Sequence, residues 1–134
     1  MSKKLKIMIV LAAILVLLVA AIAVMLTIAE RNQREVLEIE IETVDLSTIP
    51  DGTFIGEFNS FPVAAQVEVT VKDHTITAID LVKHLNGEGG DAEVIPDMVV
   101  EAQSLQVDTI SGATYSSKVI LLAIQDALQS AAGE

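Results

Sequence analysis

The residues from Asp108 to Ser116 carry the side chains whose types and spacing could do chemistry. They join a short apolar run, residues 105–110, to a helical pattern. Gly112 permits a backbone turn that a Cβ would resist, and Ala113 is expected to keep the surface beside it bare. Thr114 would then present its hydroxyl at or just before a helix N-terminus, where free N–H groups and the helix dipole favour an anion. The spacing therefore predicts a hydroxyl beside a phosphate site. The alternative is a plain helix start, with Ser111, Thr114 or Ser116 as the N-cap.

The same segment resembles the flavinylation motif of the FMN-binding domain family. That motif is Asp, two free positions, Ser or Thr, Gly, Ala, Thr or Ser, one free position, then Ser or Thr. Every fixed position is matched, by Asp108, Ser111, Gly112, Ala113, Thr114 and Ser116. The resemblance runs roughly from Asp45 to Leu128. It is similar to small membrane-anchored members and, more distantly, to the C and G subunits of sodium-pumping NADH:quinone reductase and related ion-translocating oxidoreductases.

The resemblance implies that Thr114 carries FMN through a phosphoester, made by a flavin transferase that uses FAD and Mg²⁺. The rest of the motif and its neighbour Tyr115 would surround the attachment point. The family also has a glycine-containing loop after a histidine, which helps to hold the flavin. This implies roles for His84, Asn86 and Gly87, whereas an isolated surface histidine is the alternative. Lys118 could offset phosphate charge, or it could simply be solvated.

Thr114 is not expected to be a nucleophile in an enzyme of its own. An unassisted threonine hydroxyl needs a base, and the sequence has no Gly-x-Ser-x-Gly nucleophile elbow. We interpret Thr114 as the acceptor of a modification made by another enzyme, with Asp108 helping to present the loop. The flavin would then supply the redox chemistry and the protein its binding and orientation.

The elements that must position this loop form a small α+β domain, residues 45–134. Residues 53–58, 63–71 and 75–82 are rich in β-branched side chains and predict an antiparallel meander. Which face of the third strand is buried is unclear from its pattern. An apolar stripe predicts a helix from Pro96 to about Gln103, and a second stripe predicts a helix from about Ser116 onward. We expect both helices to pack on the sheet.

The N-terminal part is expected to be a membrane anchor. Ile7–Ala29 has no charged residue and would span about 34 Å as a helix, enough for a hydrocarbon core of about 30 Å. A cleaved signal peptide is the alternative, but its apolar region is usually only about 7–15 residues long. Three lysines precede this stretch and Arg31 and Arg34 follow it, a small positive-inside bias that predicts a cytoplasmic N-terminus. Residues 30–44 would be a linker, in which alternating Leu37, Ile39 and Ile41 predict an extended segment or a charged spacer.

Charge and composition exclude several function classes. From Glu35 to Glu134 there are eighteen acidic residues against three lysines. Nucleic acid is therefore a poor partner, because phosphate binding needs Lys and Arg. The absence of cysteine excludes thiolate iron–sulfur clusters and c-type haem, and two histidines argue against a histidine-rich metal site. An electron carrier of this composition needs an organic cofactor.

Taken together, these features predict a membrane-anchored, extracytoplasmic electron-transfer flavoprotein with covalent FMN on Thr114. Its partners would be the flavin transferase and redox proteins in or outside the membrane, and a docking protein should offer a basic patch. One alternative is a non-redox module that holds FMN reversibly or not at all. Another is a flavin reductase, although no dinucleotide-binding fingerprint is present.

Overall fold

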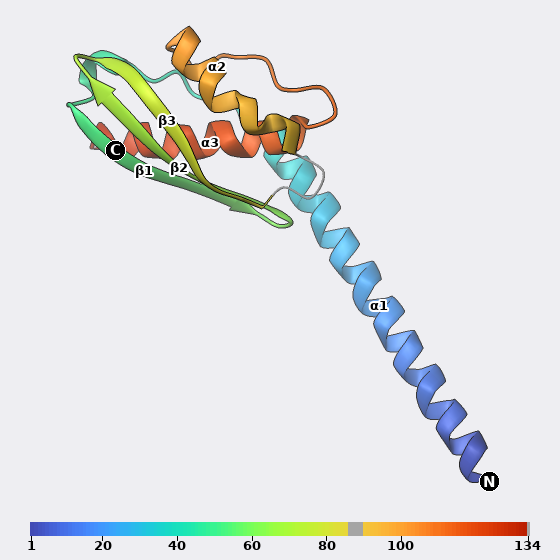
Figure 1. Ribbon diagram of the computed structural model, residues 1–134. Coiled ribbons are helices and arrows are strands. Elements are labelled where there is room, and N and C mark those ends of the chain that lie inside the picture. Colours follow the sequence, from blue (N-terminus) through green and yellow to red (C-terminus); the bar gives the residue numbers. More distant parts are fainter. Residues whose placement is uncertain (86–89, 134) are drawn as a thin grey trace.

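A long N-terminal helix leads into a small domain in which helices cover one face of a three-stranded sheet (Figure 1). The computed structural model describes residues 1–85 and 90–133. The elements are α1 (Lys3–Glu38), η1 (Leu46–Thr48), β1 (Gly52–Ser60), β2 (Val63–Lys72), β3 (Thr75–Leu85), η2 (Gly90–Val94), α2 (Ile95–Ala102) and α3 (Thr114–Ala131). The predicted α+β class, the meander and both domain helices are confirmed. The two 3₁₀ helices, η1 and η2, were not expected from the sequence.

The central strand β2 shows why these residues form a sheet with one covered face. The sheet is antiparallel with the order β1-β2-β3. Along β2 every second side chain is buried, from Val63 through Val67 to Val71. Helix α3 packs on this face (Figure 1). The strict period of two thus places the β-branched side chains against the helix and the polar ones in water.

Strand β3 does not keep the same alternation, because its pairing with β2 is irregular. The register shifts between Gln66 and Val67 and again between Thr70 and Val71. Ile76 and Ile79 are consequently both buried although they are three residues apart. An extra residue in one strand reverses the faces beyond it. This is why the buried face of β3 could not be read from the sequence.

Helix α2 covers the β3 side of the sheet and ends at Gln103, close to the predicted position. Gln103 has a left-handed backbone conformation. Its side-chain amide accepts from the N–H of Ile76 (2.8 Å) and donates to the carbonyl oxygens of Ile76 (2.8 Å) and Val100 (2.6 Å). One side chain thereby ties the end of α2 to the backbone of the edge strand.

The contact between β1 and α3 depends on Gly56. A Cβ at this position would lie 2.1 Å from the carbonyl oxygen of Ala123 and 2.5 Å from the nitrogen of Ala127. The backbones of strand and helix therefore approach more closely than any larger residue would allow. Ala123 and Ala127 are themselves fully buried on the facing side of α3.

Helix α1 runs further than the sequence predicts. The expected extended segment is wrong at Leu37 and Glu38, which are still helical; residues 39–45 have no regular structure. Tertiary contacts explain the difference. Val36 is 3% exposed and belongs to the domain core, and the Lys118 ammonium donates to the carbonyl oxygen of Leu37 (2.9 Å). A cation at a helix C-terminus is favourable.

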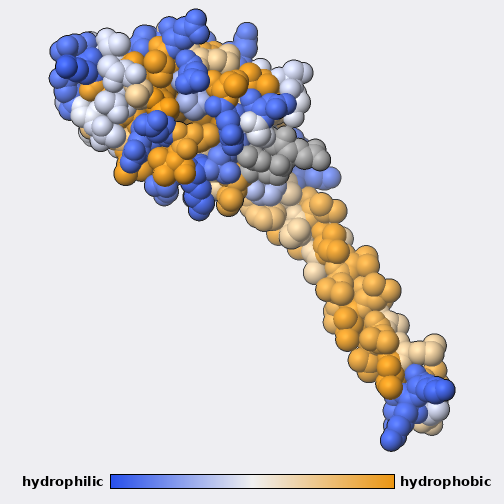
Figure 2. Space-filling model, in the orientation of Figure 1, coloured by the Kyte–Doolittle hydropathy of each residue, from blue (hydrophilic) through white to orange (hydrophobic). Residues whose placement is uncertain are grey.

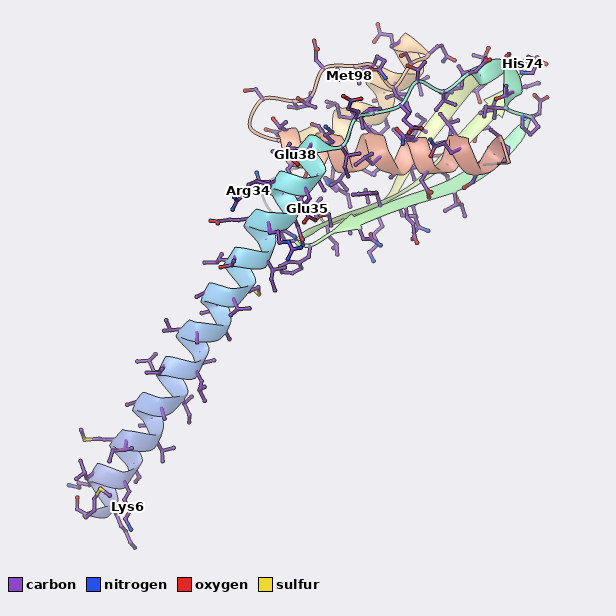
Figure 3. All side chains as sticks on the ribbon, turned by 180° about the vertical axis from the view of Figure 1, so that it is seen from behind. Lys6, Arg34, Glu35, Glu38, His74 and Met98 are labelled. Carbon is purple, nitrogen blue, oxygen red and sulfur yellow. The ribbon has the colours of Figure 1, made fainter. Side chains whose placement is uncertain are left out.

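The apolar part of α1 projects away from the domain, and its side chains are exposed (Figure 2). By length and composition this helix could cross a membrane. Charged side chains flank the apolar stretch, with Lys6 at one end and Arg34, Glu35 and Glu38 where the helix meets the domain (Figure 3). The helix is thus a candidate membrane span, and it continues without a break to the point where it contacts the domain.

The packing at Gly56 generates the first prediction. Gly56→Ala should lower the free energy of unfolding by about 1–3 kcal/mol, the usual cost of overpacking a core, because the new Cβ collides with α3 backbone. Urea unfolding of the full chain in detergent, followed by circular dichroism, measures this. Gly90→Ala is the matched control, since a Cβ there meets no atom within 4 Å. Equal midpoints for the two variants would contradict the close approach.

Candidate functional site

The N-terminus of α3 is built differently from the helix start that the sequence suggested. Ala113 occupies the N-cap position and makes no side-chain capping hydrogen bond. Thr114 is the first helical residue and is exposed. The alternatives with Ser111, Thr114 or Ser116 as N-cap are therefore wrong, and the helix begins two residues before Ser116.

Ser117, which sequence reasoning missed, holds the loop instead. Its buried hydroxyl donates to the carbonyl oxygen of Ala113 (2.7 Å) and accepts from the N–H of Ile110 (3.0 Å). The N–H of Ala113 closes the turn on the carbonyl oxygen of Ile110 (2.9 Å). Ser117 thereby holds the loop against the first turn of the helix, while the N–H groups at the helix start have no side-chain cap. Its only signal in the sequence is a serine among the apolar residues of the helix.

The small residues of the motif serve two different purposes. Gly112 has φ +81°, a left-handed conformation that glycine adopts without strain. A Cβ there would point into open space, so the need for glycine is conformational. Ala113 is 5% exposed, and the expectation that it keeps the surface bare is wrong. Its side chain packs into the core and so fixes the loop to the domain.

The arrangement leaves the Thr114 hydroxyl exposed beside the backbone N–H groups that open the helix. The first intrahelical bond runs from the N–H of Ser117 to the carbonyl oxygen of Ala113, so the N–H groups of Thr114, Tyr115 and Ser116 precede it. Such donors, with the helix dipole, suit a phosphate. An exposed Thr114 hydroxyl at this end, beside the open space at Gly112, fits a phosphate attached to that oxygen.

Tyr115 and Ser116 have their side chains on the inner side of this helix end. The Tyr115 hydroxyl donates to the carbonyl oxygen of Ser60 (2.6 Å) and lies 2.8 Å from the Ser60 hydroxyl. Ser116 is 3% exposed. Tyr115 therefore fixes the start of α3 against the end of β1, and Thr114 is left facing solvent.

His84 lies at the same end of the sheet, on the face that α3 covers. It pairs with Ala65, whose side chain is buried on that face; directly opposed residues of neighbouring strands share a face. The His84 side chain is 2% exposed and its Nδ1 lies 3.2 Å from Glu93 Oε1. The alternative of a surface histidine is wrong. Asn86 and Gly87 lie outside the described residues, and Glu93 was not singled out from the sequence.

Lys118 is not simply solvated, because its side chain is half-buried and bonded to Leu37 in α1. This contact gives it a structural role. Its predicted part in offsetting phosphate charge stays a prediction.

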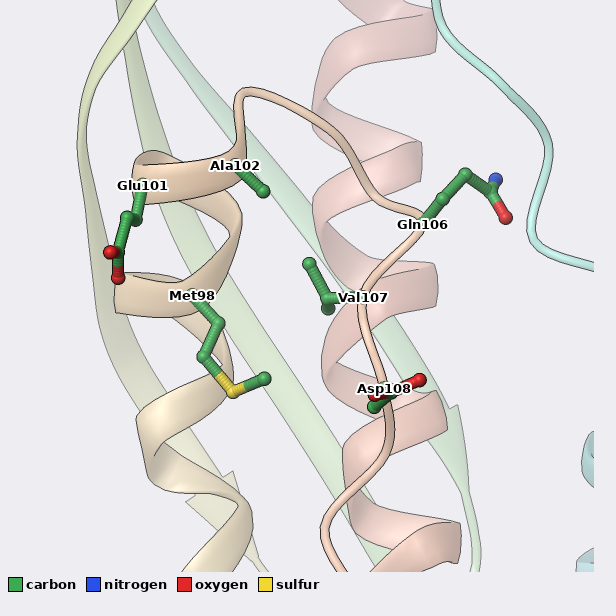
Figure 4. A pocket seen from close by; sticks show the side chains of 6 residues that line it. All are labelled: Met98, Glu101, Ala102, Gln106, Val107 and Asp108. Carbon is green, nitrogen blue, oxygen red and sulfur yellow. The ribbon is translucent and has the colours of Figure 1, made fainter.

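Asp108, the first residue of the motif, lines a cavity of about 420 Å³ between α2 and the following segment. Met98, Glu101 and Ala102 of α2 line one side of it, and Figure 4 shows the Met98 side chain pointing toward Val107 and Asp108. The sequence did not indicate this cavity, since it exists only where α2 packs beside residues 106–108. It is open to solvent and has two carboxylates in its wall, so it suits a neutral or cationic group better than an anion.

Comparison with known families agrees with this geometry. Residues 62–129, just over half of the 134-residue chain, match the model of the FMN-binding domain. The match covers β2, β3, both domain helices and the whole segment from Asp108 to Ser116. Comparisons with curated proteins and with solved structures found no match. The chain belongs to the FMN-binding domain family.

Proposed function

We propose that this protein is a membrane-anchored electron-transfer flavoprotein that carries FMN covalently on Thr114. The observation that carries the proposal is the exposed Thr114 hydroxyl at the first position of α3. It stands at the N–H end of a helix, inside a complete flavinylation motif, in a chain of the FMN-binding domain family. The other hydroxyls of that helix end, on Tyr115, Ser116 and Ser117, are buried or already hydrogen-bonded within the fold.

The attachment is a phosphoryl transfer with FAD as the donor. The Thr114 oxygen bonds to the phosphorus on the flavin side of FAD, the bond between the two phosphates breaks, and AMP leaves. A flavin transferase would supply Mg²⁺ and the base that takes the hydroxyl proton, because an unassisted threonine hydroxyl is a poor nucleophile. The chain's own part is to hold the hydroxyl outward on a turn that Gly112 and Ser117 stabilise.

Bound FMN supplies one- and two-electron redox chemistry, and the residues of this chain orient it. The α3 N-terminus would hold the phosphate through its free N–H groups. His84 with Glu93, at the same end of the sheet, and the cavity beside Asp108 are candidate contacts for the rest of the molecule. A covalent bond would prevent loss of the cofactor outside the cell, where free flavin is scarce.

The membrane part of the proposal rests on α1. Its apolar stretch is exposed to the surroundings throughout, which is costly in water and favourable in lipid. Lys3, Lys4 and Lys6 precede that stretch, so the positive-inside rule places the N-terminus in the cytoplasm and the domain outside. Its electron partners would then be proteins or quinone-linked complexes of that membrane, or acceptors beyond it.

Thr114→Ala should abolish covalent flavin, whereas Thr114→Ser should retain some, because serine keeps a hydroxyl. Each variant is co-expressed with a flavin transferase and examined by intact mass and by in-gel flavin fluorescence after denaturation. Thr109→Ala is the matched control, since Thr109 carries an exposed hydroxyl at a free position of the motif and its loss should not affect the added mass. Circular dichroism checks that all three variants fold.

A folded Thr114→Ala protein that still gains the mass of one FMN would move the attachment elsewhere, first to Ser111. A wild-type protein that binds flavin but releases it on denaturation would favour the reversible module instead. Wild-type protein without added mass despite an active transferase would refute the covalent proposal.

The orientation of α1 predicts that the domain, residues 35–134, is tethered outside the cytoplasm. Protease added to intact spheroplasts should digest the domain and leave a small membrane fragment, detected by an N-terminal epitope tag. A cytoplasmic marker protein that stays intact is the control. A domain that survives until the spheroplasts are lysed would show the opposite orientation.

The acidic domain predicts that electron transfer with a protein partner slows as ionic strength rises. Screening shortens the reach of charge to about 10 Å at 0.1 M salt, which weakens steering toward a basic patch. Stopped-flow rates at low and at physiological salt measure this. Rates that do not change would mean that the charge serves solubility alone.

A further inference from the structure

The turn between β1 and β2 lies directly beside α1, close to the end of its apolar stretch. The Asn32 side-chain amide donates to the carbonyl oxygen of Phe61 (3.0 Å). Asn32 is three residues beyond Ala29, or about 4.5 Å along a helix axis. The headgroup layers add only about 5–8 Å to each side of the hydrocarbon core. If α1 spans a bilayer, as proposed above, the Phe61 backbone is within the headgroup layer.

The side chains at this turn suit that layer. Phe61 is 49% exposed, and Leu85, which pairs with Ala64 beside the turn, is 55% exposed. Residues 59–63, Asn-Ser-Phe-Pro-Val, contain no charge in a domain that is otherwise strongly acidic. By contrast the turn at the opposite end of the sheet is Lys72-Asp73-His74. Figure 3 places His74 at the end of the domain far from α1.

The β1–β2 turn is also held by hydrogen bonds to both α1 and α3. The carbonyl oxygen of Phe61 accepts from Asn32, and that of Ser60 accepts from Tyr115. Val36 is buried in the domain core, and Lys118 binds the end of α1. These contacts run from Asn32 to Leu37 of α1, so the domain is not joined to the helix by a loose linker. The height of the β1–β2 turn above the apolar stretch is therefore set by the fold.

We propose that the β1–β2 turn is a second membrane contact, in which Phe61 enters the headgroup layer of the bilayer that α1 spans. Aromatic side chains are favoured at that boundary, and Arg31 and Arg34, on the neighbouring turn of α1, suit lipid phosphates. The contact fixes the tilt of the domain and holds the start of α3, through Tyr115, on the membrane side. The inference rests on the proposed anchor but not on the flavin.

Tryptophan fluorescence can test this contact, because the chain has no tryptophan. Three single variants of the full chain are placed in phosphatidylcholine vesicles with and without brominated acyl chains: Phe61→Trp, Leu18→Trp at the middle of the apolar stretch, and Ile55→Trp. Ile55 is 57% exposed and lies six residues back along β1, about 20 Å from the turn. The ratio of emission in the two vesicle types cancels any constant quenching by a flavin.

We expect Phe61→Trp to lose emission in brominated vesicles and to emit at shorter wavelength than Ile55→Trp, which should be quenched by aqueous iodide alone. Quenching of Leu18→Trp without quenching of Phe61→Trp would overturn the second contact while leaving the anchor intact. Absence of quenching at Leu18 as well would overturn the anchor itself. A blue-shifted but unquenched Phe61→Trp whose emission depends on the protein-to-lipid ratio would assign the turn to a second copy of the chain.

Discussion

The close approach of β1 and α3 at Gly56 is the constraint on which the rest of the domain depends. The domain buries its apolar surface chiefly between the sheet and α3. Only a residue without a Cβ lets the α3 backbone, at Ala123 and Ala127, lie against the strand. This short distance between the two backbones sets the position of the α3 axis over the sheet. It therefore also sets the position of the α3 N-terminus.

Given that axis, the start of α3 is anchored from three sides. Ser117 closes the loop from within the helix, Tyr115 reaches Ser60 on the sheet, and Lys118 binds Leu37 at the end of α1. Every one of these side chains points inward or sideways. Thr114, in contrast, is exposed, and its hydroxyl faces solvent. A modification site, as proposed for Thr114, must be both rigid and accessible, and at Thr114 the neighbouring residues supply the rigidity.

The long helix and the domain behave as one unit because the helix does not stop at the end of its apolar stretch. The residues beyond Ala29 use polar contacts, such as Asn32 with the Phe61 carbonyl, and one core contact at Val36. A rigid connection limits how far an attached cofactor can travel from the membrane. In the proposed electron carrier, it would favour exchange of electrons with partners held at a defined height, in contrast to a carrier on a flexible tether.

The sequence alone determined the elements with strong local signals. The uncharged stretch of α1, the alternation of β2 and the stripes of α2 and α3 follow from periodicity, and the motif from Asp108 to Ser116 identified the family. These signals are local, because each depends on residues within one element. The positive φ of Gly112 is also a local feature, because it depends on the freedom of the glycine backbone itself.

Tertiary structure decided the rest, because side chains from distant segments compete for the same backbone groups. The loop before α3 is held by Ser117 and has no capping hydroxyl, and Ala113 is buried instead of lying at the surface. Val36 and Lys118 kept residues 37–38 helical, and pairing with β2 reversed the faces of β3. The nearness of the Phe61 turn to α1 joins residues 29 positions apart, and no local pattern could specify it.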